Sequence, residues 1–291
     1  MTAEGPILVL GAGGMLGRAV LAEAEGRGLA VTGHDREACD VTDPEAVAGA
    51  IAAAGPSVLV NCAAWTDVDG AEADEAGAAR VNAAAPRVLA EACRDHGVRL
   101  VHVSTDYVFA GDGTAPYPVD APIEPLNAYG RTKAAGERAI REVLGEEGDW
   151  VIARTAWLYD GTSRNFLTII ARLAADRDRI EVVDDQRGRP TAAAELARQL
   201  LELVARPGAR GTFHCCNDGE ATWHDFAVAI VRGLGLDCRV DACGSDRFPR
   251  PAARPAYSVL DLSRTEATIG PIPRWEDSLA AVLDHRPAAA S

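Results

Sequence analysis

Short apolar runs alternate with alanine-rich amphipathic stretches through the first half of the chain. Runs of four or five apolar residues predict strands buried on both faces, whereas apolar residues spaced three or four apart predict helices. The alternation predicts right-handed crossovers and a Rossmann-type, doubly wound parallel α/β sheet. The predicted strands are 7–10, 30–33, 57–61, 99–103 and 149–156. Four helices are predicted between them: the first ends near 27, the second spans 45–54, the third spans 74–96 with a break near Pro86, and the fourth starts at 127.

The pattern loosens beyond Trp157. A dinucleotide-binding domain is therefore predicted over 1–158, and a smaller carboxy-terminal substrate-binding lobe over 159–291, with some segments returning to the first domain. The cleft between them is the expected substrate site. In this half, helices are predicted over 165–176, 195–205, 222–234 and 277–285, a strand over 211–217 and irregular loops over 184–191 and 247–255.

A glycine-rich turn joins the first predicted strand to the first helix. Gly11, Gly14 and Gly17 lie in this turn, and Asp35 follows the second strand, 24 residues after Gly11. Such glycines allow a tight turn and let backbone amides approach a pyrophosphate at the helix N-terminus. Asp35 suits the ribose of NADH and Arg36 suits the 2′-phosphate of NADPH, so we expect both cofactors to be used.

Polar residues follow the later strands, where ligands bind in open α/β sheets. The end of the strand 57–61 leads to Ala63, Ala64 and Thr66, and the strand 99–103 leads to Thr105 and Asp106. The strand 149–156 ends at Trp157, which the sequence leaves open between a core residue and a residue that stacks on a ligand. Asp67 and Asp69 are expected to be structural or solvated, since two buried neighbouring carboxylates need partners. His102 is expected to pack within its strand.

Tyr129 and Lys133 are four residues apart and therefore share one face of the predicted helix. Lys133 is the single lysine among 29 basic side chains. A fixed cation would make the phenol ionise more easily, so we expect a lowered pKa for Tyr129. With the Thr105 hydroxyl, this pair suits the reduction of a carbonyl by hydride transfer: Tyr129 as general acid, Thr105 as a second hydrogen-bond donor and Lys133 as the group that holds ribose and phenol together.

Composition narrows the possible partners. The net charge of −14 argues against nucleic-acid or anionic-membrane surfaces, which need a basic footprint. Met1 to Pro6 carries no basic segment and no apolar run approaches the roughly 18 residues of a membrane span, so a cytoplasmic protein is expected. The seven cysteines are odd in number and lack Cys-x-x-Cys spacing, which predicts neither disulfides nor a zinc site.

The glycine turn, the polar strand ends and the Tyr129–Lys133 pair together resemble the extended short-chain dehydrogenase/reductase superfamily, also described as the NAD-dependent epimerase/dehydratase-like superfamily. Within it, they resemble the dTDP-4-dehydrorhamnose reductases. The resemblance implies NAD(P)H-dependent reduction of the 4-keto group of dTDP-4-dehydro-β-L-rhamnose to dTDP-β-L-rhamnose. It places Thr105, Tyr129 and Lys133 in the catalytic roles given above. It also implies cofactor contacts from Gly14, Met15, Leu16, Asp40, Val41, Ala63, Ala64 and Thr66, and substrate contacts from Thr105, Asp106, Trp157 and Val68. The matching segments are 11–17, 40–43, 61–72, 104–109, 129–133, 154–157, 185–191, 222–225 and 254–258.

Two departures and two alternatives qualify the resemblance. Some similar proteins hold Mg²⁺ through glutamates at a dimer contact, but Ala19 follows Arg18 here and Glu195 is not clearly in register, so no metal is assigned. Related dehydratases carry Asp-Glu after the threonine, whereas Tyr107 follows Asp106 here, which favours plain reduction. The alternatives are reduction of another nucleotide-linked 4-keto-6-deoxy sugar, for example of the dihydrostreptose type, and a non-catalytic NADP-binding subunit that resembles the regulatory subunit of methionine adenosyltransferase. A homodimer is also possible.

Overall fold

The main sheet has six parallel strands in the order β10-β5-β4-β3-β1-β2. This computed structural model describes residues 5–285. Residues 1–4 and 286–291 lie outside it, so the outer ends of the two predicted domains and most of the Met1–Pro6 segment are not described. The predicted doubly wound parallel α/β sheet is confirmed. Its strands are β1 (Ile7–Leu10), β2 (Val31–His34), β3 (Val58–Asn61), β4 (Arg99–Thr105), β5 (Trp150–Thr155) and β10 (Gly211–His214).

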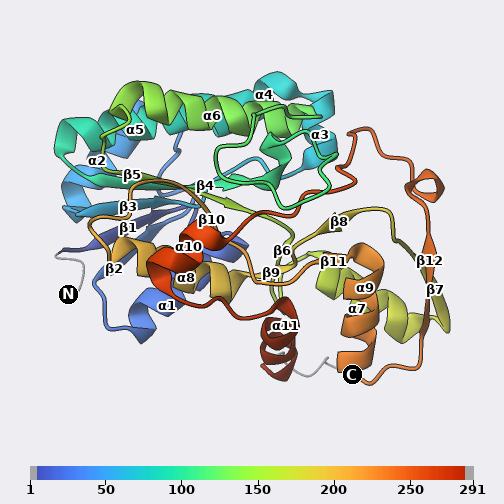
Figure 1. Cartoon of the computed structure of the whole chain (residues 1–291). Helices are drawn as coiled ribbons and strands as arrows, with labels where there is room; N and C mark the ends of the chain where they lie inside the picture. Colours follow the sequence, from blue (N-terminus) through green and yellow to red (C-terminus); the bar gives the residue numbers. More distant parts are fainter. Residues whose placement is uncertain (1–4, 286–291) are drawn as a thin grey trace.

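Helices cover both faces of the sheet (Figure 1). Successive strand residues point to opposite faces, so Val9 packs toward one helical layer and Leu10 toward the other. The first layer contains α1 (Met15–Gly26) and α8 (Ala193–Val204); the second contains α2 (Pro44–Ala54), α5 (Ala85–His96) and α6 (Ala128–Leu144). Because both faces are buried, the central strands β1 and β3 are apolar nearly throughout, and polar residues gather at and after their ends.

The predicted helix over 74–96 is divided into three segments. The chain forms α3 (Val68–Ala73) and α4 (Glu75–Ala79), continues as a π-helix, η1 (Arg80–Ala84), and then becomes α5. Pro86 lies in the first turn of α5. Proline has no amide hydrogen to donate and its ring crowds the preceding turn, which accounts for the change of helical geometry immediately before it. The predicted break near Pro86 is therefore not a break: the chain changes there from π to α geometry within a continuous helix.

The carboxy-terminal part forms small sheets and helices beside the main sheet (Figure 1). Three pairs of short strands are β6 (Leu158–Tyr159) with β9 (Thr191–Ala192), β8 (Arg187–Gly188) with β11 (Ala221–Thr222), and β7 (Arg179–Val183) with β12 (Arg239–Cys243). The sequence analysis missed these strands; β6, β8, β9 and β11 have only two residues each, which is too short for a detectable period. The remaining elements are α7 (Phe166–Asp176), α9 (Trp223–Gly233), α10 (Ser263–Ile269), α11 (Trp275–Asp284) and two 3₁₀ turns, η2 (Asp106–Val108) and η3 (Ser245–Arg247).

Two segments from beyond residue 159 belong to the main sheet. β10 pairs with β5, and α8 packs beside α1. The predicted strand over 211–217 was too long, because the strand ends at His214 and the buried Cys215 and Cys216 follow it. The division of the chain at residue 158 stays a prediction.

Two further predictions from composition can be compared with the structure. All seven cysteines are free, as their spacing predicted. Within residues 5–285, no helix combines the length and the apolar character needed to cross a membrane.

Leu200 of α8 tests how much this returning helix stabilises the fold. Its side chain is fully buried in the cluster between α8 and the sheet. Leu200→Ala should lower the free energy of unfolding by about 2 to 5 kcal/mol, because it removes buried methyl groups and leaves a cavity. Leu126→Ala is the control, since Leu126 is 45% exposed and its loss should change stability by less than about 0.5 kcal/mol. Equal unfolding midpoints in urea for the two variants would contradict this role of α8.

Candidate active site

The glycine turn brings the ends of β1 and β3 into close contact. Gly11 has a φ of 78°, and a Cβ placed on it would lie 2.6 Å from the amide nitrogen of Ala63. A Cβ on Gly17 would collide with the carbonyl oxygen of Gly11. Gly14 caps α1 without any side-chain hydrogen bond, so it has no side chain that occupies the first amides of the helix. The turn lies at the switch point between β1 and β3, where open α/β sheets bind nucleotides.

A groove of about 490 Å³ opens beside this turn. Eight of the residues predicted to bind a cofactor line it. They are Gly11, Gly14, Asp35, Arg36, Asp40, Val41, Ala63 and Ala64. The glycines have no side chains and the alanines have small ones, so this space stays open. The residues that line the groove therefore fit a dinucleotide. Gly77, Arg80 and Val81 also line the groove and were missed, because only the folding of the π-helix brings them there.

Other predicted cofactor residues are placed differently. The side chain of Leu16 is buried in the core, which leaves only its backbone to contact a ligand. Met15 and Gly17 belong to the first turn of α1, and Thr66 is an exposed residue of the following loop. None of these is among the residues that line the groove. Their cofactor contacts stay predictions.

Lys133 lies against the end of β4. Its Nζ donates to the carbonyl oxygen of Val103 at 2.7 Å and is 3.4 Å from Nε2 of His102. The side chain is only 2% exposed. Burial lowers the pKa of Lys133 to about 8, while the carboxylate of Glu137 acts in the opposite direction. His102 is also buried and bonded to Asn61, so the expectation that it packs within its strand is confirmed.

The expected lowering of the Tyr129 pKa is wrong. Burial disfavours phenolate and raises the pKa of Tyr129 to about 12, while the neighbouring Thr105 hydroxyl acts the other way and Asp106 adds to the increase. The ammonium of Lys133 is turned toward Val103 on β4, so sequence spacing alone overstated its effect on the phenol. Tyr129 therefore keeps its proton at neutral pH, as a general acid must before it acts.

Asp106 is a buried carboxyl group directly after Thr105. Thr105 Oγ1 donates to its Oδ1 at 2.9 Å, and its Oδ2 has no hydrogen-bond partner among the described residues. Burial raises the pKa of Asp106 to about 6, and the neighbouring hydroxyl groups of Ser258 and Thr105 partly oppose this. Tyr107 follows and meets the Tyr129 ring edge to face, with centroids 5.6 Å apart.

A second cavity, of about 340 Å³, lies on the other side of Tyr107. It has an aromatic part and a basic part. Trp223, which lines it, stacks on Trp157 with the ring centroids 3.6 Å apart. Trp157 is half-buried and has a φ of 48°, a strained conformation for a residue other than glycine. The lining of this cavity includes Tyr107, Phe166, Trp223, Phe248, Arg250 and Arg254.

The protein-family model described as the RmlD substrate binding domain matches residues 5–287. The chain belongs to this family. The dTDP-4-dehydrorhamnose reductase of Streptomyces griseus is 48% identical over 278 residues, covering 94% of this chain and 91% of that protein. The dTDP-4-keto-6-deoxy-D-glucose reductase of Streptomyces niveus is 46% identical over 275 residues, covering 94% of each.

A solved structure agrees with this assignment. The dTDP-4-dehydrorhamnose reductase of Bacillus anthracis, in complex with NADP, is 32% identical and has a TM-score of 0.92, covering 98% of this chain and 99% of that chain. The predicted resemblance to the extended short-chain dehydrogenase/reductase superfamily is therefore confirmed.

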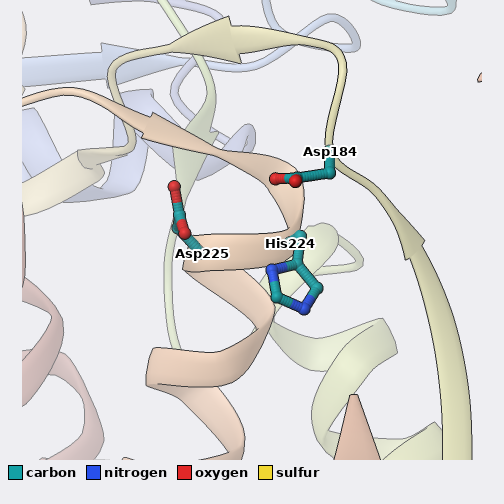
Figure 2. A group of neighbouring side chains, drawn as sticks. All are labelled: Asp184, His224 and Asp225. Carbon is teal, nitrogen blue, oxygen red and sulfur yellow. The ribbon is translucent and has the colours of Figure 1, made fainter. Parts of the chain in front are cut away.

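Two carboxylates and one imidazole lie together beside the start of α9 (Figure 2). Ligand atoms of Asp184, His224 and Asp225 lie within 4.8 Å of one another. The cluster is explained by the cap of α9: the Thr222 hydroxyl donates to Asp184 at 2.7 Å, and the Thr222 amide donates to Asp225 at 3.0 Å. The positive end of the helix dipole favours these anions without a metal.

Two residues singled out by sequence have structural partners. Glu195 begins α8 and accepts two hydrogen bonds from Arg198 and one from Gln199. Asp69 pairs with Arg254 at 3.0 Å and accepts a hydrogen bond from the Ala252 amide, so its expected structural role is confirmed.

Asn82 is a site residue that sequence reasoning missed. It lies in the π-helix and is 1% exposed. Its side chain accepts from the Trp65 amide at 2.9 Å, donates to the Trp65 carbonyl oxygen at 3.0 Å and donates to Thr132 at 3.2 Å. It therefore fixes the loop after β3 against the helix that carries Tyr129 and Lys133. An asparagine in an alanine-rich helical run gives no sequence signal for this role.

Asp106 should make stability depend on pH. The raised pKa means that the folded state binds a proton more tightly than the unfolded chain, so the free energy of unfolding should fall as pH rises from 3.8 to about 6. Asp106→Asn should flatten this dependence and stabilise the protein by about 1 to 3 kcal/mol at neutral pH. Urea unfolding across this pH interval provides the measurement. An unchanged slope in the variant would assign the dependence to another group.

Proposed function

We propose that this chain is an NAD(P)H-dependent reductase of a dTDP-linked 4-keto-6-deoxy sugar, with dTDP-4-dehydro-β-L-rhamnose as its substrate and dTDP-β-L-rhamnose as its product. The position of Tyr129 carries the proposal. Trp65, which lines the glycine-turn groove, packs with Tyr129 against one small cluster, and Tyr107, which lines the second cavity, contacts Tyr129 from the other side. A protonated phenol thus lies between a space for the cofactor and a space for the sugar.

The chain's own residues supply the proton and the orientation in this reaction. Bound nicotinamide supplies the hydride. The Oη of Tyr129 gives its proton to the 4-keto oxygen as that oxygen gains negative charge, and the Oγ1 of Thr105 stabilises the same oxygen through a hydrogen bond. Lys133 lies one turn later on α6, where its ammonium is held against β4 and contributes a positive charge to the site. The small groups at Gly11, Ala63 and Ala64 allow the cofactor to lie against the strand ends, with its pyrophosphate at the start of α1.

The second cavity supports a nucleotide-linked substrate. Arg250 and Arg254 present guanidinium groups, which suit the phosphates of a diphosphate. Trp223 and Phe248 provide flat apolar surfaces for a base. Asp69 pairs with both arginines, at 3.7 Å and 3.0 Å, and thereby keeps them on this side of the site. The substrate roles of Asp106, Trp157 and Val68 belong to the same proposal.

A second candidate function is the reduction of another dTDP-linked 4-keto-6-deoxy sugar by the same chemistry. Reductases named for rhamnose and for 4-keto-6-deoxyglucose are 48% and 46% identical to this chain, so overall identity favours neither. Specificity rests on few side chains. A panel of dTDP-linked 4-keto sugars, assayed by oxidation of NADPH under equal conditions, decides between them. Preference for a sugar other than the rhamnose precursor would favour the second candidate.

Cofactor binding without turnover of any keto sugar would favour a regulatory subunit. A cytoplasmic location and a homodimer stay predictions from the sequence.

Tyr129→Phe should lower kcat by at least about 100-fold, because it removes the proton donor. The measurement is oxidation of NADPH with the dTDP-linked keto sugar. Tyr159→Phe is the matched control, since Tyr159 is fully buried and its hydroxyl has no hydrogen-bond partner among the described residues. Full turnover by Tyr129→Phe would show that another group supplies the proton.

NADH and NADPH should both support turnover, with kcat/KM values within about 100-fold of each other. Asp35 and Arg36 are both exposed at the groove and act oppositely on a 2′-phosphate. Arg36→Ala should lower kcat/KM for NADPH and leave that for NADH nearly unchanged. A larger preference in the wild type would show that one of these two side chains dominates.

A further inference from the structure

A fully buried carboxylate, that of Glu137, lies one helical turn after Lys133 on α6. It accepts four hydrogen bonds. Ser104 Oγ donates to Oε1 at 2.6 Å, and Arg141 Nη2 donates to Oε2 at 3.0 Å. Arg154 donates through two nitrogens, at 2.9 Å and 2.7 Å, in a bidentate pair. These donors hold the pKa of Glu137 below its usual value despite burial, so the group stays ionised.

The network joins the elements that carry the proposed catalytic residues. Ser104 immediately precedes Thr105 on β4, and Arg154 on β5 is three residues before Trp157. Arg154 is itself 1% exposed and also donates to the carbonyl oxygen of Val119, in the loop before α6. One carboxylate therefore connects α6 with β4 and β5 at the end of the sheet where the site lies.

The same carboxylate acts electrostatically on Lys133. It opposes the effect of burial and favours the ammonium form. The other titratable groups near Lys133 act differently. His102 lies 3.4 Å from Nζ and is neutral because of burial, and the Cys62 thiol has its pKa raised to about 12 by burial. No carboxylate oxygen lies within 4.0 Å of Lys133 Nζ in the described part of the chain, so Glu137 acts on this cation across one turn of α6 while it pairs directly with Arg141 and Arg154.

We propose that Glu137 is a positioning residue of the reductase: it is the buried counter-charge of Lys133 and, through Ser104, it fixes Thr105 relative to Tyr129. This inference rests on the proposed function. It differs from a purely structural ion pair, because a structural pair would change stability and leave the titration of Lys133 unaltered.

Glu137→Gln keeps the shape of the side chain and removes its charge. Loss of a nearby anion lowers the pKa of a lysine, so the alkaline limb of the kcat/KM profile should move down by about one pH unit. The affinity for NADPH, measured by fluorescence titration without substrate, should fall off at a correspondingly lower pH. Glu142→Gln is the matched control, since Glu142 lies on the same helix in an exposed pair with Arg87 and should leave both profiles unchanged.

Ser104→Ala separates the two parts of the proposal. The variant removes one hydrogen bond and keeps the charge of Glu137. It should lower kcat by about three- to tenfold through a less well fixed Thr105, with the alkaline limb unmoved. Far-UV circular dichroism establishes that each variant is folded. If Glu137→Gln does not fold, a wild-type kcat in Ser104→Ala overturns the proposal.

The outcomes distinguish this inference from the proposed function. If the wild type reduces the keto sugar and Glu137→Gln titrates like Glu142→Gln, the inference is overturned and the function stands. If the wild type reduces no keto sugar, the proposed function fails. The NADPH titration then still decides whether Glu137 controls the charge of Lys133: a shifted profile supports the proposal, and profiles that coincide overturn it.

Discussion

Burial of the main sheet on both faces is the constraint on which the rest of this structure depends. Helices cover each face, so an uncompensated polar group within the sheet would cost several kcal/mol. Polar chemistry is therefore confined to the strand ends, where the chain leaves the core. Parallel strands bring these ends to one edge, which explains why the glycine turn after β1 and the alanines after β3 lie around a common space, with Thr105 at the same edge at the end of β4. The family's chemistry follows from this topology.

The same burial sets the protonation states of the site. Removing a group from water disfavours its charged form. For Tyr129 and Asp106 the result is a raised pKa, and for Lys133 a lowered one. The phenol is thereby kept as a proton donor, while the ammonium needs a counter-charge to persist. Glu137 remains ionised because four hydrogen bonds compensate its burial. Loss of hydration thus shifts the pKa of each residue toward its neutral form, and the hydrogen-bonding partners decide which residue still carries charge.

Substrate recognition is assigned to the less regular part of the chain. The second cavity takes its lining from η2, α7, β7, α9 and the loop over 247–255, which are far apart in sequence. Loops and short strands tolerate change in individual side chains without loss of the sheet. This arrangement agrees with the existence of relatives that share nearly half of their residues with this chain and are named for different keto sugars. In the proposed function, the main sheet carries the residues of the reaction, and the added elements carry those that recognise the substrate.

Sequence alone determined the α/β class and the strand–glycine–helix unit, and it led to the proposed set of Thr105, Tyr129 and Lys133, because these depend on local periodicity, turn chemistry and short motifs. Only the tertiary structure placed Asn82, Glu137 and Arg154 around them, since contacts over tens of residues have no local signal. Tertiary structure also reversed the expected shift of the Tyr129 pKa. Spacing along a helix shows that two side chains share a face, but it shows neither how deeply they are buried nor where they point. In this protein, burial and the turn of Lys133 toward β4 outweighed its proximity to the phenol.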